Sequence, residues 1–212
     1  MAVPIKNLFG RQNPIRVALR KRRLGCALVD WEAAGRPAPT PDLVKRGLIK
    51  AYARRFGCLY FVETGTYSGE TVQASLNTFR KIWSIELSPE FAAAAQKRFA
   101  AYPHVRIIRG DSGKLLQEVV PQLDQPTLFW LDGHYCGGNT AKGDTECPIF
   151  AELDAVFSGQ PARDVILIDD ARSFVGKSDY PTIRQLRDYV VKRDPNLQFY
   201  VADDAVRIHR PD

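Results

Sequence analysis

The sequence predicts a doubly wound α/β fold with a mixed sheet, because short apolar runs alternate with longer helical segments from Cys58 onward. Five runs rich in Val, Ile, Leu and aromatic residues are predicted as strands: Leu59–Glu63, Lys81–Glu86, Val105–Arg109, Thr127–Asp132 and Val165–Asp169. The segments between them have helical length and period: Gly69–Phe79, Pro89–Ala101, Gly113–Val120 and Pro148–Phe157. This alternation favours βαβ crossovers and a parallel sheet covered by helices on both faces.

The C-terminal part departs from this alternation. A helical segment opens at Pro181 and runs to about Arg193, and two more strands follow it, Leu197–Ala202 and Ala205–His209. Because only Asp203-Asp204 separates these strands, they are predicted to form an antiparallel hairpin. The complete sheet is therefore expected to have seven strands, mostly parallel, with an antiparallel pair at the end.

The N-terminal segment is basic and helical. Thr40-Pro41-Asp42 is predicted to cap a helix that runs to about Phe56 and ends at Gly57. Residues 1–55 hold 13 Lys and Arg against 3 Asp and Glu, whereas the remaining 157 residues hold 17 against 21. We therefore divide the chain into a basic helical extension, residues 1–56, and a domain over residues 57–212. The positive charge indicates either an anionic partner or a solvated helix face.

The composition of the 212 residues suits a packed globular protein with one main domain. No run of about 18 apolar residues is present, so no membrane span is expected. Arg16 and the Arg20–Arg23 cluster interrupt the only stretch that could resemble a secretory signal. None of the four cysteines forms a C-x-x-C pair, and reduced thiols fit the cytoplasm, where we place the protein.

A glycine-containing turn, Glu63-Thr64-Gly65-Thr66-Tyr67-Ser68-Gly69, follows the first predicted strand. Gly65 and Gly69 allow a tight turn and a close approach of the backbone to a ligand, unless they serve only the turn. The pattern differs from the G-x-G-x-x-G of dinucleotide-binding turns, because Tyr67 stands at its second glycine. Glu63 would repel a pyrophosphate and attract a cationic amino acid group. The turn therefore favours S-adenosylmethionine (SAM) over NAD.

Two more acidic residues follow the second and third predicted strands. Glu86, 21 residues after Gly65, can accept hydrogen bonds from both ribose hydroxyls of a nucleoside. Asp111, followed by Ser112, can accept one from an adenine amino group, although this pair also suits a helix cap. Because ligands of open α/β sheets bind beyond the carboxyl ends of the strands, these acids are expected to share one site.

Together with Asp132, these motifs resemble motifs I to IV of class I SAM-dependent methyltransferases over about residues 57–210, and imply their Rossmann-like fold. The resemblance implies that Glu63, Gly65, Thr66 and Gly69 surround the methionine part of SAM. It also implies that Glu86 holds the ribose, while Asp111 and Ser112 flank the adenine. The remaining members of the expected cofactor site are Tyr67, Ser68, Leu87 and Asp132.

Three acidic residues lie at or directly after the ends of the fourth and fifth predicted strands, which are neighbours in the class I order: Asp132, Asp169 and Asp170. Acids that converge at one edge repel each other unless a cation joins them, and oxygen ligands suit Mg²⁺ or another hard divalent ion. The trio resembles the metal site of the divalent-metal-dependent O-methyltransferases of the catechol and macrocin types. The alternatives are that Asp132 contacts cofactor or substrate without metal, and that Asp170 caps a turn or pairs with Arg172.

The resemblance implies a methyl transfer in which a metal ion orients a substrate hydroxyl and Asp132 lies at the reacting centre. His134, two residues later, is a candidate general base, and its alternative is a structural loop residue. The expected acceptor is a small hydroxylated molecule, a sugar or a phenol. Two other functions stay open: methylation of RNA or another polyanion docked on the basic segment, and a non-catalytic SAM-fold binding module. A homodimer is also left open.

Overall fold

The computed structural model describes residues 25–133, 147–161 and 163–212. Within them, seven strands form one sheet in the order β3-β2-β1-β4-β5-β7-β6. The strands are β1 (Tyr60–Thr64), β2 (Lys81–Glu86), β3 (Val105–Arg109), β4 (Thr127–Leu131), β5 (Val165–Ile168), β6 (Gln198–Ala202) and β7 (Ala205–His209). β1 to β5 pair in parallel, and β7 runs antiparallel to both β5 and β6. The predicted mixed sheet is confirmed.

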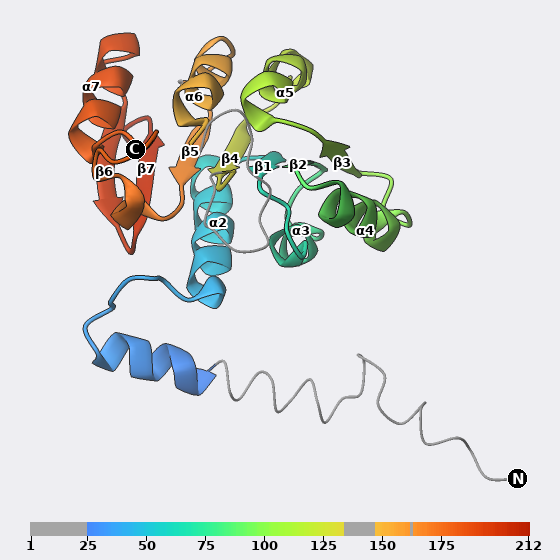
Figure 1. Ribbon diagram of the computed structural model, residues 1–212, viewed down its shortest axis with the longest axis horizontal. Coiled ribbons are helices and arrows are strands. Elements are labelled where there is room, and N and C mark those ends of the chain that lie inside the picture. The colour runs from blue at the N-terminus through green and yellow to red at the C-terminus, as the bar shows by residue number, and fades with distance from the viewer. Residues whose placement is uncertain (1–24, 134–146, 162) are drawn as a thin grey trace, which may run out of the picture.

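Helices cover both faces of the sheet, as Figure 1 shows. One face carries α5 (Ser112–Val119), α6 (Ile149–Phe157) and α7 (Ile183–Arg193). The other face carries α2 (Asp42–Phe56), α3 (Glu70–Ser75) and α4 (Pro89–Phe99). Short 3-10 turns occupy Val120–Gln122 and Ala171–Ser173, and residues 25–33 form a further helix outside these layers. The fold is therefore doubly wound, as expected.

The strands are apolar on both faces because each face packs into its own core. In β1, Val62 belongs to the core formed with α5, α6 and α7, whereas Phe61 belongs to the core formed with α2, α3 and α4. All five residues of β1, and all five of β4, are buried. The continuous apolar runs of the sequence thus reflect a sheet buried between two helical layers.

Most helix boundaries follow the local sequence signals. Ser88 caps α4, with Pro89 in the first turn, and Thr182 opens α7 with a capping box that includes Gln185. Gly57 ends α2 in the left-handed conformation, with φ 65°. The expected cap at Thr40 is wrong: Pro41 is the N-cap residue and makes no side-chain cap bond. Thr40 Oγ1 instead donates to the Asp203 carbonyl oxygen at 2.7 Å.

The register brings the carboxyl ends of the central strands into line. Thr64 pairs with Ile85 of β2 and with Leu131 of β4, and Leu131 pairs with Ile168 of β5. The residues that follow these positions lie in one row at the same edge of the sheet: Gly65, Glu86, Asp132 and Asp169. Backbone bonds across the row continue the ladder, as from the Asp169 amide to the Leu131 carbonyl at 3.0 Å.

α2 packs into the core even though we assigned its residues to the N-terminal extension. Ile49, Tyr52, Ala53 and Phe56 are buried in the cluster shared with α3 and α4. The division at residue 56 stays a prediction, but α2 contributes directly to the packing of the sheet. No helix among the described residues has the length and apolar character needed to span a bilayer.

Truncation of a buried α2 side chain is expected to destabilise the whole fold. Ile49 is 1% exposed, and Ile49→Ala should lower the free energy of unfolding by about 2–5 kcal/mol in urea titrations. Lys50 is the next residue of α2 and is partly exposed, so Lys50→Ala should change the free energy of unfolding by less than about 0.5 kcal/mol. Equal stability of the two variants would show that α2 is a detachable extension.

Candidate functional site

The turn after β1 is shaped by residues with positive φ. Gly65 has φ 81°, Tyr67 has φ 46° and Gly69 has φ 73°. A Cβ atom on Gly65 would collide with the carbonyl oxygen of Asp132, which is backbone and cannot move aside. Glycine is therefore required at this position both by conformation and by space. The turn lets β1 and β4 approach each other where the strands end.

Glu63 is a buried acid inside this turn and not a residue of its surface. Its side chain is 2% exposed, and its Oε2 accepts a hydrogen bond from Ser84 Oγ at 2.7 Å. Ser84 Oγ also contacts Thr66 Oγ1 at 2.5 Å, so β2 and the turn are linked through this acid. The pKa of Glu63 is raised to about 8, chiefly by burial; the hydrogen bond from Ser84 opposes this rise, and the nearby charge of Asp132 adds to it.

Glu86 is positioned at the tip of β2 by two backbone amides. Its Oε2 accepts from the Tyr67 amide at 2.7 Å and its Oε1 from the Ser88 amide at 2.8 Å. The residue is 7% exposed. Each carboxylate oxygen has a second lone pair, so both can still accept a hydroxyl donor from a ligand. The tip of β2 is thus fixed to the glycine turn through a side chain.

Asp111 and Ser112 open α5 beyond β3. Asp111 is the N-cap residue, and its Oδ1 accepts from the Gly113 amide at 2.9 Å, so the capping role holds. Ser112 is buried, and its Oγ would lie 3.0 Å from a Cβ atom placed on Gly133. The start of α5 therefore approaches the segment that follows β4, which closes this side of the site.

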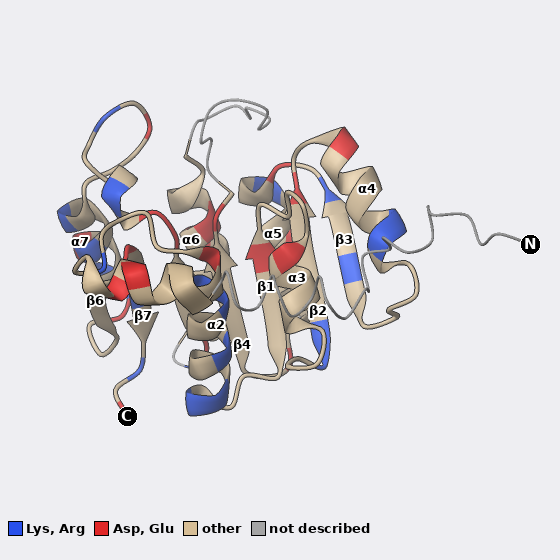
Figure 2. Ribbon diagram, turned by 90° about the horizontal axis from the view of Figure 1, so that it is seen from below, with Lys and Arg blue, Asp and Glu red and all other residues tan. Residues whose placement is uncertain are grey.

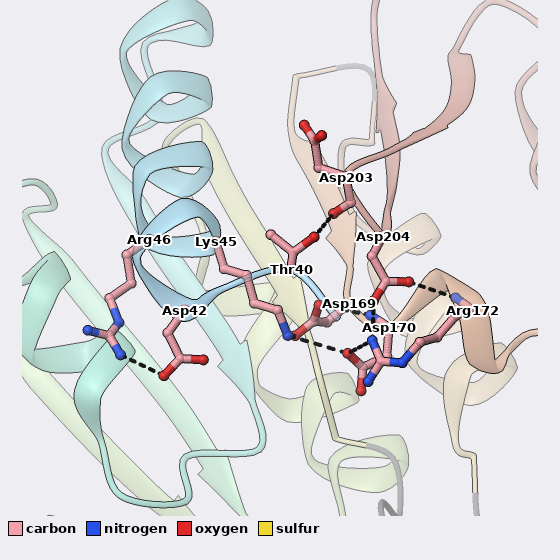
Figure 3. Close-up of polar contacts among 9 residues, drawn as sticks. All are labelled: Thr40, Asp42, Lys45, Arg46, Asp169, Asp170, Arg172, Asp203 and Asp204. Carbon is pink, nitrogen blue, oxygen red and sulfur yellow. Dashed lines mark hydrogen bonds and ion pairs between the residues drawn. The ribbon is translucent and has the colours of Figure 1, made fainter. Parts of the chain in front are cut away.

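The two acids beyond β5 are joined by a lysine of α2 (Figure 3). Lys45 Nζ lies 2.5 Å from Asp169 Oδ2 and 3.3 Å from Asp170 Oδ1. Asp170 Oδ1 also accepts from Arg172 Nη1 at 2.8 Å, so the pairing of these two residues is confirmed. Burial alone would lower the pKa of Lys45, but the charge of Asp169 outweighs it and the pKa is raised. Lys45 is therefore a lasting positive charge.

A cavity of about 120 Å³ lies where these elements meet. Its lining includes α2, the glycine turn and the residues after β4 and β5: Lys45, Arg46, Gly65, Thr66, Asp132 and Asp169. The cavity therefore connects the turn, with the buried Glu63 behind it, to the charged cluster around Lys45. One wall is supplied by the helix that precedes β1.

A scan against protein-family models and a search of curated proteins find no match. Solved structures do match. One of them is the SAH-bound methyltransferase PaMTH1 of Podospora anserina, which is 19% identical and has a TM-score of 0.56. The match covers 100% of this chain and 99% of that chain. The SAH-bound O-methyltransferase of Bacillus cereus has 15% identity and a TM-score of 0.57, with 87% and 89% covered. The O-methyltransferase TomG of Streptomyces achromogenes, with SAM, has 17% identity and a TM-score of 0.55, with 81% and 84% covered. This chain has the class I methyltransferase fold.

The carboxylates of this class I fold do not form the predicted metal site. Within residues 25–133, 147–161 and 163–212, no three His, Cys, Asp or Glu side chains cluster so as to hold an ion. The physical reason is Lys45: its ammonium contacts Asp169 Oδ2, while Asp169 Oδ1 accepts from the Asp170 amide at 2.8 Å. Asp169 Oδ1, Asp169 Oδ2 and Asp170 Oδ1 thus already accept hydrogen bonds, and the Lys45 ammonium repels a second cation beside them, so the set does not fit a divalent ion as it stands.

Sequence reasoning missed three polar residues of the site. Lys45 gave no signal because it lies 124 residues before its partner Asp169. Ser84 is a polar residue inside the apolar strand β2, and Glu152 is an acid on the buried face of the apolar helix α6. A buried polar residue within an apolar pattern was the available signal for both. His134, the candidate base, lies outside the described residues.

Proposed function

We propose that this chain is a SAM-dependent methyltransferase that transfers a methyl group to a hydroxyl of a small molecule, a sugar or a phenol. The observation that carries the proposal is the row of Gly65, Glu86, Asp132 and Asp169 beside one cavity at the carboxyl edge of the sheet. The SAM- and SAH-bound methyltransferases of the same fold support it. SAM supplies an activated methyl group on a sulfonium sulfur when it is bound.

Each cofactor-binding residue has a chemical role in this proposal. The backbone from Gly65 to Gly69, including Thr66, Tyr67 and Ser68, receives the methionine part, with Glu63 as the partner of its ammonium group. Glu86 accepts the ribose hydroxyls, and the neighbouring Leu87 contacts the same sugar. Asp111 and Ser112 flank the adenine at the start of α5. The proposed contacts thus run along the strand ends: the methionine part lies at β1, the ribose at β2 and the adenine at β3.

The acceptor lies in the cavity between the glycine turn and the Lys45 cluster. Asp132 lines this cavity directly after β4, so its carboxylate takes the proton that the acceptor hydroxyl loses. His134, two residues later, stays a predicted second base. Divalent-metal assistance is part of the sequence-based hypothesis, but the Lys45 ammonium already contacts one oxygen each of Asp169 and Asp170. The proposed reaction therefore includes no metal step.

Docking of a polyanion on the basic segment stays an alternative: three of the five basic residues of α2 are paired within the chain, but the seven Lys and Arg of residues 1–24 lie outside the described residues. Figure 2 shows Lys and Arg along α2. Arg46 pairs with Asp42 at 3.0 Å, and Arg55 pairs with Asp212. Lys45 is held by the acids after β5. The free thiols of Cys26, Cys58 and Cys147 suit the cytoplasm, where we place the reaction.

Calorimetric titration with SAH tests the cofactor site. Glu86→Ala should weaken SAH binding by at least about tenfold, because hydrogen bonds to a charged acceptor are lost. Glu118→Ala, on the exposed face of α5, should leave the affinity unchanged. Thermal melting would show that the Glu86 variant is folded. Unchanged SAH binding in both Glu63→Ala and Glu86→Ala would refute the proposed function.

A further inference from the structure

The Lys45 cluster is built from parts of the chain that are distant in sequence. Lys45 comes from α2, whereas Asp169 and Asp170 follow β5 (Figure 3). The Lys45 side chain is 19% exposed, and those of Asp169 and Asp170 are 2% and 9% exposed. A lysine ammonium is strongly hydrated, so its withdrawal from water to this edge needs compensation, which the two carboxylates supply. The cluster therefore holds its cation in a defined place.

The charge of the acidic pair is already balanced by side chains of the chain itself. Asp169 faces Lys45, and Asp170 faces both Lys45 and Arg172. Arg172 is in turn held by Asp204, which also accepts a hydrogen bond from the Arg172 amide at 2.9 Å. A divalent ion at Asp169 Oδ2 or Asp170 Oδ1 would lie close to the Lys45 ammonium, and repulsion between the two cations disfavours the presence of both.

The position of Lys45 is fixed by the packing of α2 against the sheet. Ile49, Tyr52 and Phe56 hold the helix in the core, and Thr40 anchors the residues before it to the carbonyl of Asp203 in the β6–β7 turn. Arg207 Nη2 contacts the Asp203 carboxylate at 2.9 Å and stabilises the same turn. The ammonium is thus presented by a rigid element and is not carried on a loop.

We propose that the Lys45 ammonium takes the place of a divalent cation at this edge, so that the site works without a metal and Lys45 itself positions the acceptor oxygen. The proposal rests on the proposed function of the chain. An ammonium has three N–H donors, and among the described residues two of them serve Asp169 and Asp170. The third serves the acceptor hydroxyl in the cavity, which Lys45 lines together with Gly65 and Asp132.

The transfer then balances without a metal-bound oxygen. A lone pair of the acceptor oxygen forms the new bond to the methyl carbon, and the carbon–sulfur bond breaks with its electrons passing to sulfur. The products are the methyl ether and SAH. The hydroxyl proton passes to the Asp132 carboxylate, and Lys45 keeps its own proton throughout. Its fixed charge stabilises the negative charge that develops on the acceptor oxygen.

Manganese binding distinguishes this arrangement from a metal site. The full chain is dialysed against EDTA and then buffer, and Mn²⁺ binding is followed by the EPR signal of the free ion. Lys45→Met removes the ammonium while keeping an unbranched side chain, and it should bind Mn²⁺ at least about tenfold more tightly than wild type, because two buried carboxylates lose their cation. Lys50→Ala, on the same helix but outside the cavity lining, should bind Mn²⁺ as wild type does.

The gained site should disappear in the double variant Lys45→Met/Asp169→Asn, which assigns it to this cluster. The proposal would be overturned if wild type bound Mn²⁺ as tightly as Lys45→Met does. That result is expected if Lys45 only forms a structural ion pair and leaves a metal site intact beside it. If circular dichroism shows that Lys45→Met is unfolded, the test rests on Mn²⁺ binding to wild type and to Asp169→Asn. A Mn²⁺ site in wild type that Asp169→Asn removes overturns the proposal, and the absence of one supports it.

Titration of wild type with SAH in the presence of EDTA separates this inference from the proposed function. Loss of SAH binding would remove the function while leaving the Mn²⁺ comparison valid. SAH binding that survives EDTA, combined with a Mn²⁺ site gained only in Lys45→Met, supports both. SAH binding with a tight Mn²⁺ site in wild type would leave a methyltransferase whose acidic edge holds a metal, and Lys45 would lose its role.

Discussion

Gly65→Ala is expected to weaken SAH binding by about 100-fold, which corresponds to about 2.7 kcal/mol, because the glycine turn must shift to make room for the side chain. The added Cβ would meet the Asp132 carbonyl oxygen, so β1 and β4 must separate at the point where the cofactor is expected to bind. The φ of 81° adds strain of about 1–2 kcal/mol for a residue with a side chain. Calorimetric titration with SAH measures the first effect, and urea unfolding measures the second.

Gly47→Ala is the matched control for this substitution. Gly47 lies within α2, and a Cβ atom placed there meets nothing within 4 Å. Alanine is the better helix former, so this variant should be more stable by about 0.5–1 kcal/mol and should bind SAH normally. Normal SAH binding and wild-type stability in Gly65→Ala would show that the turn has room for a side chain, and the close approach of β1 to β4 would lose its significance.

The sequence was sufficient to predict the sheet because its strands are buried on both faces and carry continuous apolar runs. The acids at the strand ends were also predictable, since a parallel sheet places every such residue at one edge. Glu86 illustrates this: its position after β2 is enough to bring it to the turn, where it accepts from the Tyr67 amide. Strand periodicity and topology thus determine which residues meet, without knowledge of any side-chain contact.

The state of these side chains could not be predicted in the same way. The sequence predicts Glu63 as a carboxylate that faces a cationic group, but burial favours its neutral form. It also predicts Asp132, Asp169 and Asp170 as metal ligands, whereas Lys45 contacts Asp169 and Asp170 from α2. Desolvation and long-range ion pairs depend on how helices pack, and no local pattern around residue 45 or residue 63 records that packing.

Glu63 also gives the protein a stability that decreases with rising pH. Below its ordinary pKa of 4.5, Glu63 is protonated in both the folded and the unfolded state and contributes nothing to the pH dependence. Between that value and about 8, only the unfolded state releases the proton, so unfolding is favoured by up to about 1.4 kcal/mol per pH unit. Above about pH 8 both states are ionised and the slope ends.

The same burial makes SAH binding depend on pH in the opposite direction. The ammonium of the bound ligand favours the Glu63 carboxylate, so binding releases the proton that free Glu63 holds below about pH 8. Affinity should therefore rise with pH by up to about tenfold per unit well below the pKa, and by about 50-fold between about pH 6 and about pH 8. Calorimetry in buffers of different ionisation enthalpy measures both the affinity and the number of protons released.

Glu63→Gln is the control that isolates this proton. The amide keeps the shape of the side chain and an acceptor for Ser84 Oγ, which lies 2.7 Å from Oε2 in the wild type, but it does not titrate. The variant should bind SAH with little change across the same pH range, and its stability should lose the decline assigned to Glu63. Titration of the ligand's own amine affects both proteins equally, so it cancels in the comparison. An identical pH slope in wild type and Glu63→Gln would mean that Glu63 does not face the ligand's ammonium group, and the acidic turn would then lose its role in choosing SAM.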